Sequence, residues 1–555
     1  MTVRNEKLIR CAILALMSCS LLITSAGCTA HDAPPAVLQE QQPADSSASS
    51  LSSTAALNVQ DALIPMGKSS GVFYEIFVRS YADSNGDGIG DFNGITAKLN
   101  YLQDLGIKGI WLMPINPSPS YHGYDVTDYY AVNPDYGNLD DLKHLLEEAH
   151  KRDIQIIMDL VLNHTSSEHP WFVDSAKGTD STKRDWYVWA EDQQMDTGKL
   201  GAWGQQAWHK RDGNHYLGVF WDGMPDLNMN NEEVRAELKK IAHYWLDLGM
   251  DGFRLDAAKH VYEDFQNTGQ TPEVIEANRT WWHEFREAVE SSKPGAYLAG
   301  EIWDAPAVIG PFLDKSFQSA FNFDMAGRMI SMVESERDAD IGSMMSRIYS
   351  FYSKSSNGTF VDAPFLSNHD QDRVMTQVSG KLEHAKMAAS VLLTLPGNPF
   401  MYYGEEIGMQ GAKPDELIRE PMRWTEDTNE PENTSWEAPL SNSDTVSVEQ
   451  QLQDEDSLLL HYKKMIALRN QDPVLQDGGI MSYMSGVAQV AGYVRATQED
   501  KRLVLHNLSG ETQSVTLTEA AKGTFGELSF ASRVDAVLAD GEVTIPPYST
   551  VVLSP

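Results

Sequence analysis

Three acidic side chains stand at or just past the ends of short apolar runs. They are Asp256, after the run 252–255, Glu301, after the run 297–300, and Asp370, after the run 360–366. Two carboxyl groups held close together can divide covalent catalysis between a nucleophile and a proton donor. A lone loop carboxylate is most often only a solvated surface group. Three acids at corresponding positions of different strands indicate instead one shared pocket.

The elements that must position these acids are eight β-branched or aromatic runs, separated by amphipathic helical stretches such as 139–152 and 232–248. This alternation is typical of a parallel α/β architecture. Eight such units predict a (β/α)₈ TIM barrel, in which the chemistry lies at the carboxyl ends of the strands. The expected strands are 72–78, 109–114, 154–161, 252–255, 297–300, 319–323, 360–366 and 399–403.

Two further segments accompany the barrel, which is expected over residues 67–164 and 225–475. Residues 165–224 are rich in Trp, Tyr, Gly and Asp and show little periodicity, so we expect an inserted subdomain after the third strand. Residues 476–555 change to period-two runs separated by turn residues, which predicts a C-terminal all-β sandwich domain. The strands expected there are 489–496, 502–508, 514–517, 543–545 and 550–553.

The N-terminal segment predicts export. Residues 1–27 begin with basic residues and continue as an uncharged apolar stretch, too short for a membrane-spanning helix, as in a lipoprotein signal peptide. Cys28 then stands where a bacterial lipoprotein is lipidated, and residues 28–66 have the Ala-, Ser-, Pro- and Gln-rich composition of a flexible linker. We expect an envelope protein anchored through Cys28, with plain secretion as the alternative. The other two cysteines lie inside the signal peptide, so the body has no thiol for disulfides or Cys-based sites.

The formal net charge of −36 limits the possible partners. Nucleic acid and anionic lipid require a basic surface, so neither is expected to bind. The excess of acids is consistent with solubility outside the cell and with a neutral ligand. No second apolar stretch is long enough to span a bilayer, so membrane contact is expected only through the lipid anchor, and the protein is expected to be a monomer.

Five motifs together resemble those of the α-amylase superfamily of retaining glycoside hydrolases, and the resemblance covers nearly all of residues 70–555. By that resemblance Asp256 is the nucleophile, Glu301 is the acid/base, and Asp370 binds sugar hydroxyls and favours the distorted transition state. A retaining mechanism needs its two carboxyl groups roughly 5 Å apart. The motifs are 109–114, 159–164, 252–260, Glu301 with its flanks, and 365–370.

The same resemblance implies a set of substrate-binding residues. His164 and His369 would hydrogen-bond the sugar in the cleavage subsite, and the segment with His122 and Tyr124 would present an aromatic platform to it. Arg254 lies two residues before the nucleophile on the same strand face, where a guanidinium favours an ionised carboxylate. Glu301 has the opposite requirement, because a proton donor needs a raised pKa. The full set is His122, Tyr124, His164, Arg254, Lys259, His260 and His369.

The run 83–91 alternates oxygen-bearing side chains with glycines, which suits a hard cation such as Ca²⁺. The run starts like an EF-hand loop, but Gly94 stands where the closing Glu should be, which disfavours an EF-hand. The run resembles a single calcium loop found after the first strand in part of the superfamily. The alternative is an Asp/Asn/Gly turn without metal, and a second Ca²⁺ that uses Asn163 is also possible. The expected ligands are Asp83, Asn85, Asp87, the carbonyl of Ile89, and Asp91.

The motifs leave the action pattern open. Residues 224–228 look intermediate between oligo-1,6-glucosidases and neopullulanases, whereas Lys259 and His260 follow the nucleophile as in α-amylases, where they contact sugars on the leaving-group side. We expect endo-hydrolysis of α-1,4-glucosidic bonds in starch and malto-oligosaccharides. The alternatives are α-glucosidase, neopullulanase-like or transglycosylating action, and, from another class, a non-catalytic glycan-binding relative, which the three acids disfavour.

Overall fold

The computed structural model describes residues 56–201, 204–262, 271–427 and 430–555. The expected signal peptide and Cys28 lie outside the described residues. Across these four ranges, no helix combines the length and the apolar character needed to cross a bilayer.

A parallel sheet forms the centre of the molecule, and its strands follow the order β8-β7-β6-β3-β2-β1-β9. The eighth position is taken by a segment that forms only isolated parallel bridges, from Ala363 to Phe321 and from Phe365 to Phe400. These bridges connect the two edges of the sheet, so the predicted (β/α)₈ barrel is confirmed. The strands are β1 (Phe73–Ile76), β2 (Gly109–Leu112), β3 (Gln155–Leu160), β6 (Gly252–Leu255), β7 (Tyr297–Gly300), β8 (Ser319–Ala320) and β9 (Phe400–Tyr402).

The barrel interior is packed with aromatic side chains. Phe73 stacks on Tyr297 and on Phe400, with ring centroids 5.2 and 4.9 Å apart. Trp111 continues this cluster toward the strand ends, where it faces Phe321 at 5.3 Å. Side chains fill a barrel of eight strands completely, so the polar groups of the site lie above a dry core.

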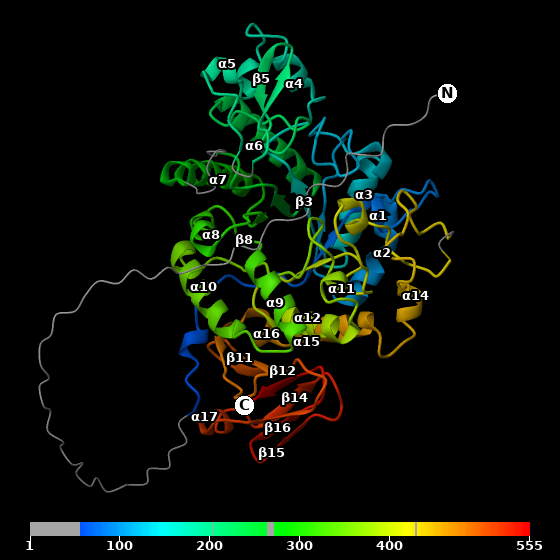
Figure 1. The fold of residues 1–555 in the computed structure, drawn as a ribbon, viewed down its shortest axis with the longest axis vertical. Helices are drawn as coiled ribbons and strands as arrows, with labels where there is room; N and C mark the ends of the chain where they lie inside the picture. The colour runs from blue at the N-terminus through cyan, green and yellow to red at the C-terminus, as the bar shows by residue number, and fades with distance from the viewer. Residues whose placement is uncertain (1–55, 202–203, 263–270, 428–429) are drawn as a thin grey trace, which may run out of the picture. The chain divides into compact units, whose positions relative to one another are not determined.

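The outer helices begin and end at residues suited to helix termini. Asn138 and Asp141 form a capping box at the start of α3 (Leu139–His150), and Asn231 caps α6 (Glu232–Leu248). Leucine and other apolar residues on one face of each helix are buried in the main hydrophobic core. Figure 1 shows these helices around the strands. The remaining principal outer helices are α2 (Phe92–Leu105), α7 (Pro272–Ser292), α8 (Pro306–Phe312), α9 (Phe323–Ser335), α10 (Ile341–Ser356), α12 (Leu382–Thr394) and α15 (Leu458–Gln471).

One glycine fixes the strand that carries Asp256. Gly252 has a φ of 155°, and a Cβ at this position would lie 1.9 Å from the carbonyl oxygen of Tyr297. Only glycine permits this approach of β6 to β7. The close contact sets the register that brings the ends of the two strands together.

The insertion between β3 and α6 contains short helices and a hairpin, which Figure 1 shows at the end of the molecule opposite the C-terminal domain. Bridges from His164 to Asp226 and from Tyr187 to Leu227 join its two ends beside the barrel. This is the inserted subdomain that the sequence predicts after the third strand. Its elements are α4 (Pro170–Ser175), α5 (Ala190–Gln193), β4 (Trp208–Arg211) and β5 (Asn214–Leu217).

The C-terminal domain is a β-sandwich, as expected. One sheet has the order β10-β11-β12-β17-β14 and the other β13-β16-β15, and a separate apolar core lies between them. Three of these strands, β10, β14 and β15, are absent from the sequence-based prediction. The eight strands of the sandwich are β10 (Gly479–Ser482), β11 (Val490–Ala496), β12 (Lys501–Asn507), β13 (Gln513–Thr516), β14 (Glu527–Ala531), β15 (Val537–Ala539), β16 (Glu542–Ile545) and β17 (Ser549–Ser554).

Residues 56–66 differ from the flexible linker expected there. The backbone N–H of Leu57 donates a hydrogen bond to Thr524, and Leu57 and Val59 pack against the sandwich core. A short 3₁₀ helix follows at Gln60–Ala62, and Ala62 is fully buried. The apolar residues scattered through this stretch explain the difference, because they gain more from burial than the chain loses in freedom.

Candidate active site

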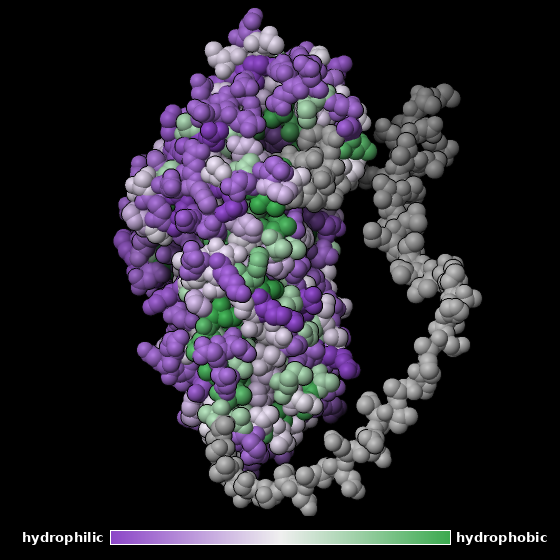
Figure 2. All heavy atoms as spheres, turned by 90° about the vertical axis from the view of Figure 1, so that its left-hand side faces the viewer, coloured by the Kyte–Doolittle hydropathy of each residue, from purple (hydrophilic) through white to green (hydrophobic). Residues whose placement is uncertain are grey.

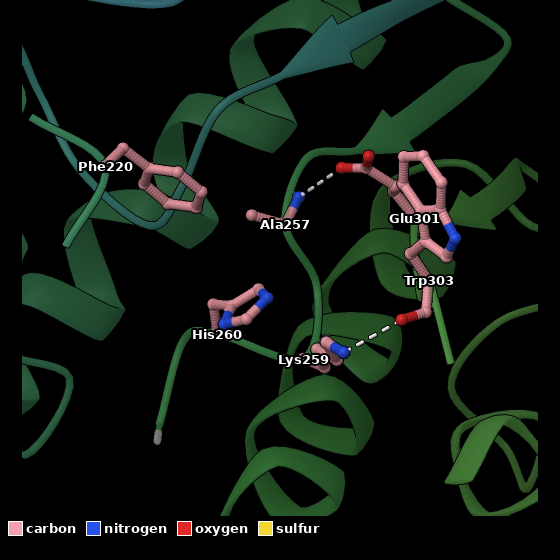
Figure 3. Close-up of a pocket in the computed structure, with 6 residues that line it drawn as sticks. All are labelled: Phe220, Ala257, Lys259, His260, Glu301 and Trp303. Atoms are coloured by element: carbon pink, nitrogen blue, oxygen red, sulfur yellow. Dashed lines mark hydrogen bonds between the residues drawn. The ribbon is translucent and has the colours of Figure 1, made fainter. Parts of the chain in front are cut away.

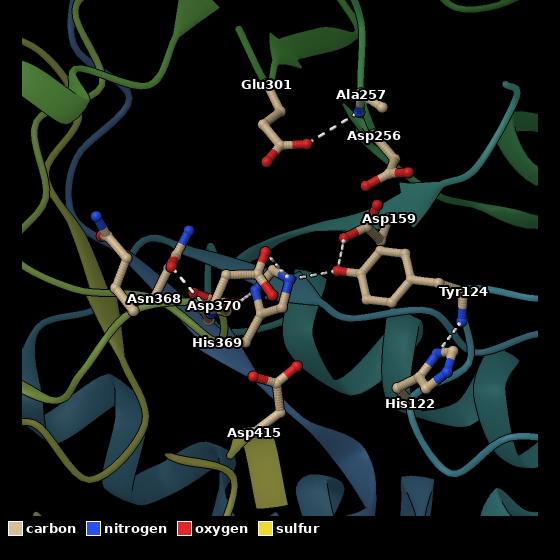
Figure 4. Close-up of polar contacts among 12 residues, drawn as sticks. His122, Tyr124, Asp159, Asp256, Ala257, Glu301, Asn368, His369, Asp370 and Asp415 are labelled. Carbon is tan, nitrogen blue, oxygen red and sulfur yellow. Dashed lines mark hydrogen bonds and ion pairs between the residues drawn. The ribbon is translucent and has the colours of Figure 1, made fainter. Parts of the chain in front are cut away.

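The three acids that the sequence singles out lie at one end of the barrel. Asp256 follows β6, Glu301 follows β7, and Asp370 follows the bridged segment that completes the sheet. Figure 4 shows their carboxyl groups around a common space, with His369 beside Asp370 and Tyr124 near Asp159. Parallel strands bring their carboxyl ends to the same edge, which explains how residues so distant in sequence meet.

Arg254 is the centre of the charge network. Its guanidinium is buried, at 1% exposure, and lies 2.6 Å from Asp256 Oδ1 and 2.9 Å from Glu301 Oε2. It also donates hydrogen bonds to both oxygens of Asp159, at 2.9 and 3.1 Å. Because one guanidinium contacts Asp256 and Glu301 together, their carboxyl groups are held near each other, as a retaining mechanism requires.

Glu301 is set up to hold a proton. Burial raises its pKa, Arg254 opposes this rise, and the neighbouring carboxylates Asp256 and Asp370 add to it. Its Oε2 accepts a hydrogen bond of 2.9 Å from the backbone N–H of Ala257. Ala257 has a φ of 46°, a left-handed conformation that costs a residue with a Cβ about 1 kcal/mol or more. The strained turn after Asp256 thus aims an amide at the acid/base candidate.

A chain of hydrogen bonds runs behind these acids through His369. Its Nδ1 lies 2.5 Å from Glu75 Oε1, and its Nε2 lies 2.6 Å from the Tyr124 hydroxyl and 3.1 Å from Asp370 Oδ2. Burial lowers the pKa of His369, but the charges of Asp370 and Glu75 outweigh it and raise the pKa to about 10. His369 is therefore an imidazolium at neutral pH.

Asp370 has two cationic partners. Besides His369, the guanidinium of Arg419 lies 3.1 Å from Asp370 Oδ1 and 3.1 Å from Asp415 Oδ2. Burial raises the pKa of Asp370, yet these cations and Arg254 hold it well below its usual range. Asp370 is fixed as a carboxylate that can accept hydrogen bonds from hydroxyl groups.

The aromatic and histidine candidates gather on one wall of the site. The Tyr124 ring stacks on His369 with centroids 5.5 Å apart, and the Tyr124 hydroxyl donates a hydrogen bond of 2.9 Å to Asp159. His122 Nδ1 accepts a hydrogen bond from the Tyr124 backbone N–H at 3.1 Å. Burial lowers the pKa of His122, and it lowers that of His164 to about 4, so both are neutral. Neutral imidazoles can both donate to and accept from a sugar.

A cavity of about 300 Å³ opens beside Glu301 (Figure 3). Lys259 and His260 line it, and the Lys259 ammonium is held by the Trp303 carbonyl at 2.9 Å and by Asp304 at 3.0 Å. Phe220 and Trp303 add two partly exposed aromatic rings. The structure therefore places Lys259 and His260 in a cavity beside Glu301, and it places Tyr124 and His369 beside Asp370 and Arg254.

Four charged residues of the network were not predicted as site residues, although Asp159 lies within the motif 159–164. They are Glu75, Asp159, Asp415 and Arg419. Glu75 lies on β1, Asp159 on β3 and Arg419 after the short helix α13 (Asp415–Ile418). Burial raises the pKa of Asp159 to about 7 against the pull of Arg254. Glu75 and Asp159 did leave a signal, because a charged residue within a fully apolar strand must have a buried partner. Arg419 lies in an irregular segment and has no comparable signal.

The predicted calcium loop is well ordered. Asp83 accepts hydrogen bonds from the backbone of Asn85, Gly86 and Gly88, and Asp91 accepts them from Ser84 and Gly94. Among the described residues, no group of three or more His, Cys, Asp or Glu side chains converges as a metal site. The loop nonetheless curls through Gly86 and Gly88, both at positive φ, and its oxygen donors have the chemistry that Ca²⁺ prefers.

A closed (β/α)₈ barrel whose strand ends hold two carboxyl groups on one arginine is the arrangement of a retaining glycoside hydrolase. The family described as alpha amylase, catalytic domain, matches residues 75–478, and the alpha-amylase SusG C-terminal domain matches residues 490–552. The chain belongs to the α-amylase catalytic-domain family, which confirms the resemblance seen in the sequence.

Relatives in this family match most of the chain. Alpha-amylase 3 of Dictyoglomus thermophilum is 40% identical over 484 residues, which covers 87% of this chain and 92% of the relative. A 4-alpha-glucanotransferase of Thermotoga neapolitana is 34% identical over 489 residues, which covers 86% of this chain and 99% of the relative. The alpha-amylase from H. orenii, known from a crystal structure, is 42% identical in sequence with a TM-score of 0.81. The match covers 88% of this chain and 99% of that one.

The Glu75–His369 pair should make stability depend on pH. The pKa of His369 is raised from 6.5 to about 10, so its charge stabilises the fold fully below pH 6.5 and the contribution is lost as the pH rises through 10. Glu75→Gln removes one of the two carboxylates that raise this pKa. We expect the variant to be less stable than wild type at pH 7, by on the order of 2 kcal/mol, with the difference shrinking toward pH 10.

Urea unfolding at pH 6, 7, 8, 9 and 10 measures this difference. Glu449→Gln, at an exposed position, is the matched control and should follow wild type throughout. A Glu75→Gln deficit that stays constant from pH 6 to pH 10 would show that the ion pair is not the cause.

Proposed function

We propose that this protein is an endo-acting α-amylase that hydrolyses α-1,4-glucosidic bonds with retention of configuration. The observation that carries the proposal is the single buried guanidinium shared by Asp256 and Glu301. Sugar-binding candidates on both sides of this pair support cleavage inside a chain rather than only at its end. The α-amylase relatives of similar length support the choice of substrate.

In the first step Asp256 attacks the anomeric carbon while Glu301 gives its proton to the glycosidic oxygen. The bond between that carbon and oxygen breaks, the reducing-side sugar leaves with the proton, and a glycosyl ester forms on Asp256. The Ala257 amide and Arg254 then stabilise the new negative charge on Glu301.

In the second step Glu301 takes a proton from water as the water oxygen attacks the same carbon from the other face. The ester bond breaks, Asp256 regains its charge, and Glu301 is protonated again. Two inversions give net retention. Asp370 accepts hydrogen bonds from ring hydroxyls throughout, since its two cations keep it ionised.

Amylose should be cut internally. A long chain fills the positions around Tyr124 and those around Lys259 together, and this remote binding energy raises the rate at the reacting bond. We expect rapid loss of iodine staining, maltose and longer oligosaccharides as early products, and weak action on maltose, measured by timed chromatography.

Asp256→Asn should lower the rate by about 10³-fold or more while sparing binding.

Several outcomes would redirect this proposal. Glucose as the sole early product, or faster turnover of isomaltose than of amylose, would favour the α-glucosidase alternative. Early products longer than the substrate would favour transfer, the reaction named for the 4-alpha-glucanotransferase relative. An Asp256→Asn protein with more than a few per cent of wild-type rate would contradict the nucleophile assignment.

We also propose that the loop 83–91 binds Ca²⁺ as a structural ion. Asp83, Asn85, Asp87, the Ile89 carbonyl and Asp91 would supply the oxygen donors, and the loop leads into α2 rather than into the catalytic space. The ion would neutralise acids that the turn brings together.

Calcium should therefore raise the melting temperature, because a ligand that binds only the folded state stabilises it. We expect a chelator to lower the melting temperature by several degrees, and Asp87→Ala to lose this response. Asp535→Ala, at an exposed site in the sandwich domain, is the control and should respond as wild type does. Identical melting of wild type and Asp87→Ala in chelator and in millimolar calcium would contradict the metal site.

Finally, we propose that the exported protein is attached to a membrane of the cell envelope by a lipid on Cys28. The sequence from the basic start to Cys28 supports this location. One diacylglycerol with any further acyl chain holds a protein by chain burial.

Cys28→Ser should convert the wild-type protein from the detergent phase to the aqueous phase without loss of amylose hydrolysis. Phase partitioning of both proteins measures this, with Asp256→Asn as a control that should stay anchored. A fully aqueous wild type, or a Cys28→Ser protein that still enters detergent, would contradict the anchor.

A further inference from the structure

A second cavity lies on the outer side of α6 and shares no lining residue with the cavity beside Glu301. Its volume of about 340 Å³ is similar to that of the catalytic cavity, about 300 Å³. The insertion and the first turns of α6 form it together, so it is a feature of the assembled fold. Trp171, Lys183 and Trp186 come from the insertion, and Glu233, Ala236 and Glu237 come from α6.

Two tryptophans make an aromatic corner in this cavity. The rings of Trp171 and Trp186 have centroids 4.9 Å apart and planes at 66°. Tyr129 stacks on one face of Trp171 at 5.7 Å and the His169 ring lies 4.3 Å from it, yet Trp171 remains partly exposed, whereas Trp186 is buried. The uncovered part of the indole therefore faces the cavity, where it can stack on the flat apolar side of a sugar ring.

The polar groups of the cavity can both donate and accept hydrogen bonds. The Lys183 ammonium lies 3.0 Å from the centroid of Trp186, and no hydrogen bond or ion pair joins it to another residue in the described ranges. Burial lowers its pKa. Glu233 Oε2 accepts a weak hydrogen bond of 3.3 Å from Trp186 Nε1 and has a second oxygen to offer. An ammonium and a carboxylate beside indole rings are a typical set for hydroxyl groups.

Positive and negative charges in the cavity are balanced, which limits the class of ligand that it can bind. Lys183 and Lys240 face Glu233 and Glu237, and Glu237 is already held by the Tyr130 hydroxyl at 2.8 Å and by Lys240 at 3.0 Å. A phosphate would be repelled by the two carboxylates, and a cation would be repelled by the two ammonium groups. A neutral, hydroxyl-rich ligand meets neither penalty.

We propose that this cavity is a second glycan site, which binds one or two glucosyl units of an α-glucan outside the catalytic cleft. The inference rests on the proposed function for the identity of the chain. Barrel helices run opposite to the strands, so the first turns of α6 lie at the same end as Asp256 and Glu301. Figure 1 shows α6 beside the insertion at this end. When a polymer is bound at the second cavity, the effective concentration of its remaining units at the catalytic cleft rises.

The face drawn in Figure 2 does not favour a protein partner instead. In the face drawn in Figure 2 the upper part is mainly hydrophilic, and apolar residues lie in small separate groups. A stable protein interface needs a broader apolar area than this.

Ala236→Met tests the site by filling the cavity from an exposed helical position, where methionine is well tolerated. In an Asp256→Asn background we expect adsorption to insoluble starch granules to weaken about threefold or more. In the active protein, the rate on granules should fall to a similar extent, while kcat/KM on a soluble aryl maltotrioside stays within about twofold of wild type. Lys183→Met is a second variant with the same expected pattern.

Ser331→Met, on an exposed turn of α9, is the matched control and should adsorb as wild type does. Wild-type adsorption by both Ala236→Met and Lys183→Met would overturn the inference, as would equal losses in Ser331→Met or on the soluble substrate. A failure of the proposed function would give a different result, because the wild-type protein itself would then release no sugar from amylose.

Discussion

The buried guanidinium of Arg254 is the interaction on which the rest of the site depends. An isolated cation at 1% exposure would cost several kcal/mol, and three carboxylates, Asp159, Asp256 and Glu301, compensate it. Burial opposes the charge of Arg254, but these acids outweigh burial and raise its pKa well above the ordinary value. The dependence is mutual, since without the arginine the three carboxyl groups would repel one another in a space with little water.

This single cation meets two opposite chemical demands. It lies 2.6 Å from Asp256, the proposed nucleophile, which would have to remain a carboxylate, and 2.9 Å from Glu301, the proposed acid/base, which would have to begin the reaction as an acid. The difference comes from the rest of the surroundings. Glu301 is raised in pKa by burial and by Asp256 and Asp370 despite the arginine. The strand register set at Gly252 is therefore as necessary to the chemistry as the ionisable groups are.

The sequence predicts those parts of the fold that have a local pattern. All eight barrel strands, the insertion and the sandwich follow from periodicity and turn residues, and three acids at strand ends were enough to locate the site. The strands β10, β14 and β15 were not predicted, because short half-exposed strands gain their order from partners far along the chain. Glu75 left a signal as a charged residue within an apolar strand, but no local pattern identifies its partner. That partner is His369, which is 294 residues away.

The network also explains how an acidic protein can bind a neutral polymer. The chain has a formal net charge of −36, and five carboxyl groups, Glu75, Asp159, Asp256, Glu301 and Asp370, surround the site. Arg254, Arg419 and the His369 imidazolium balance three of these charges. The raised pKa values of Glu301 and of Asp159, about 7 for the latter, allow protons to balance much of the remainder. A sugar chain would therefore meet a cleft in which cations and protons offset part of the acidic charge and in which many groups can hydrogen-bond to hydroxyls.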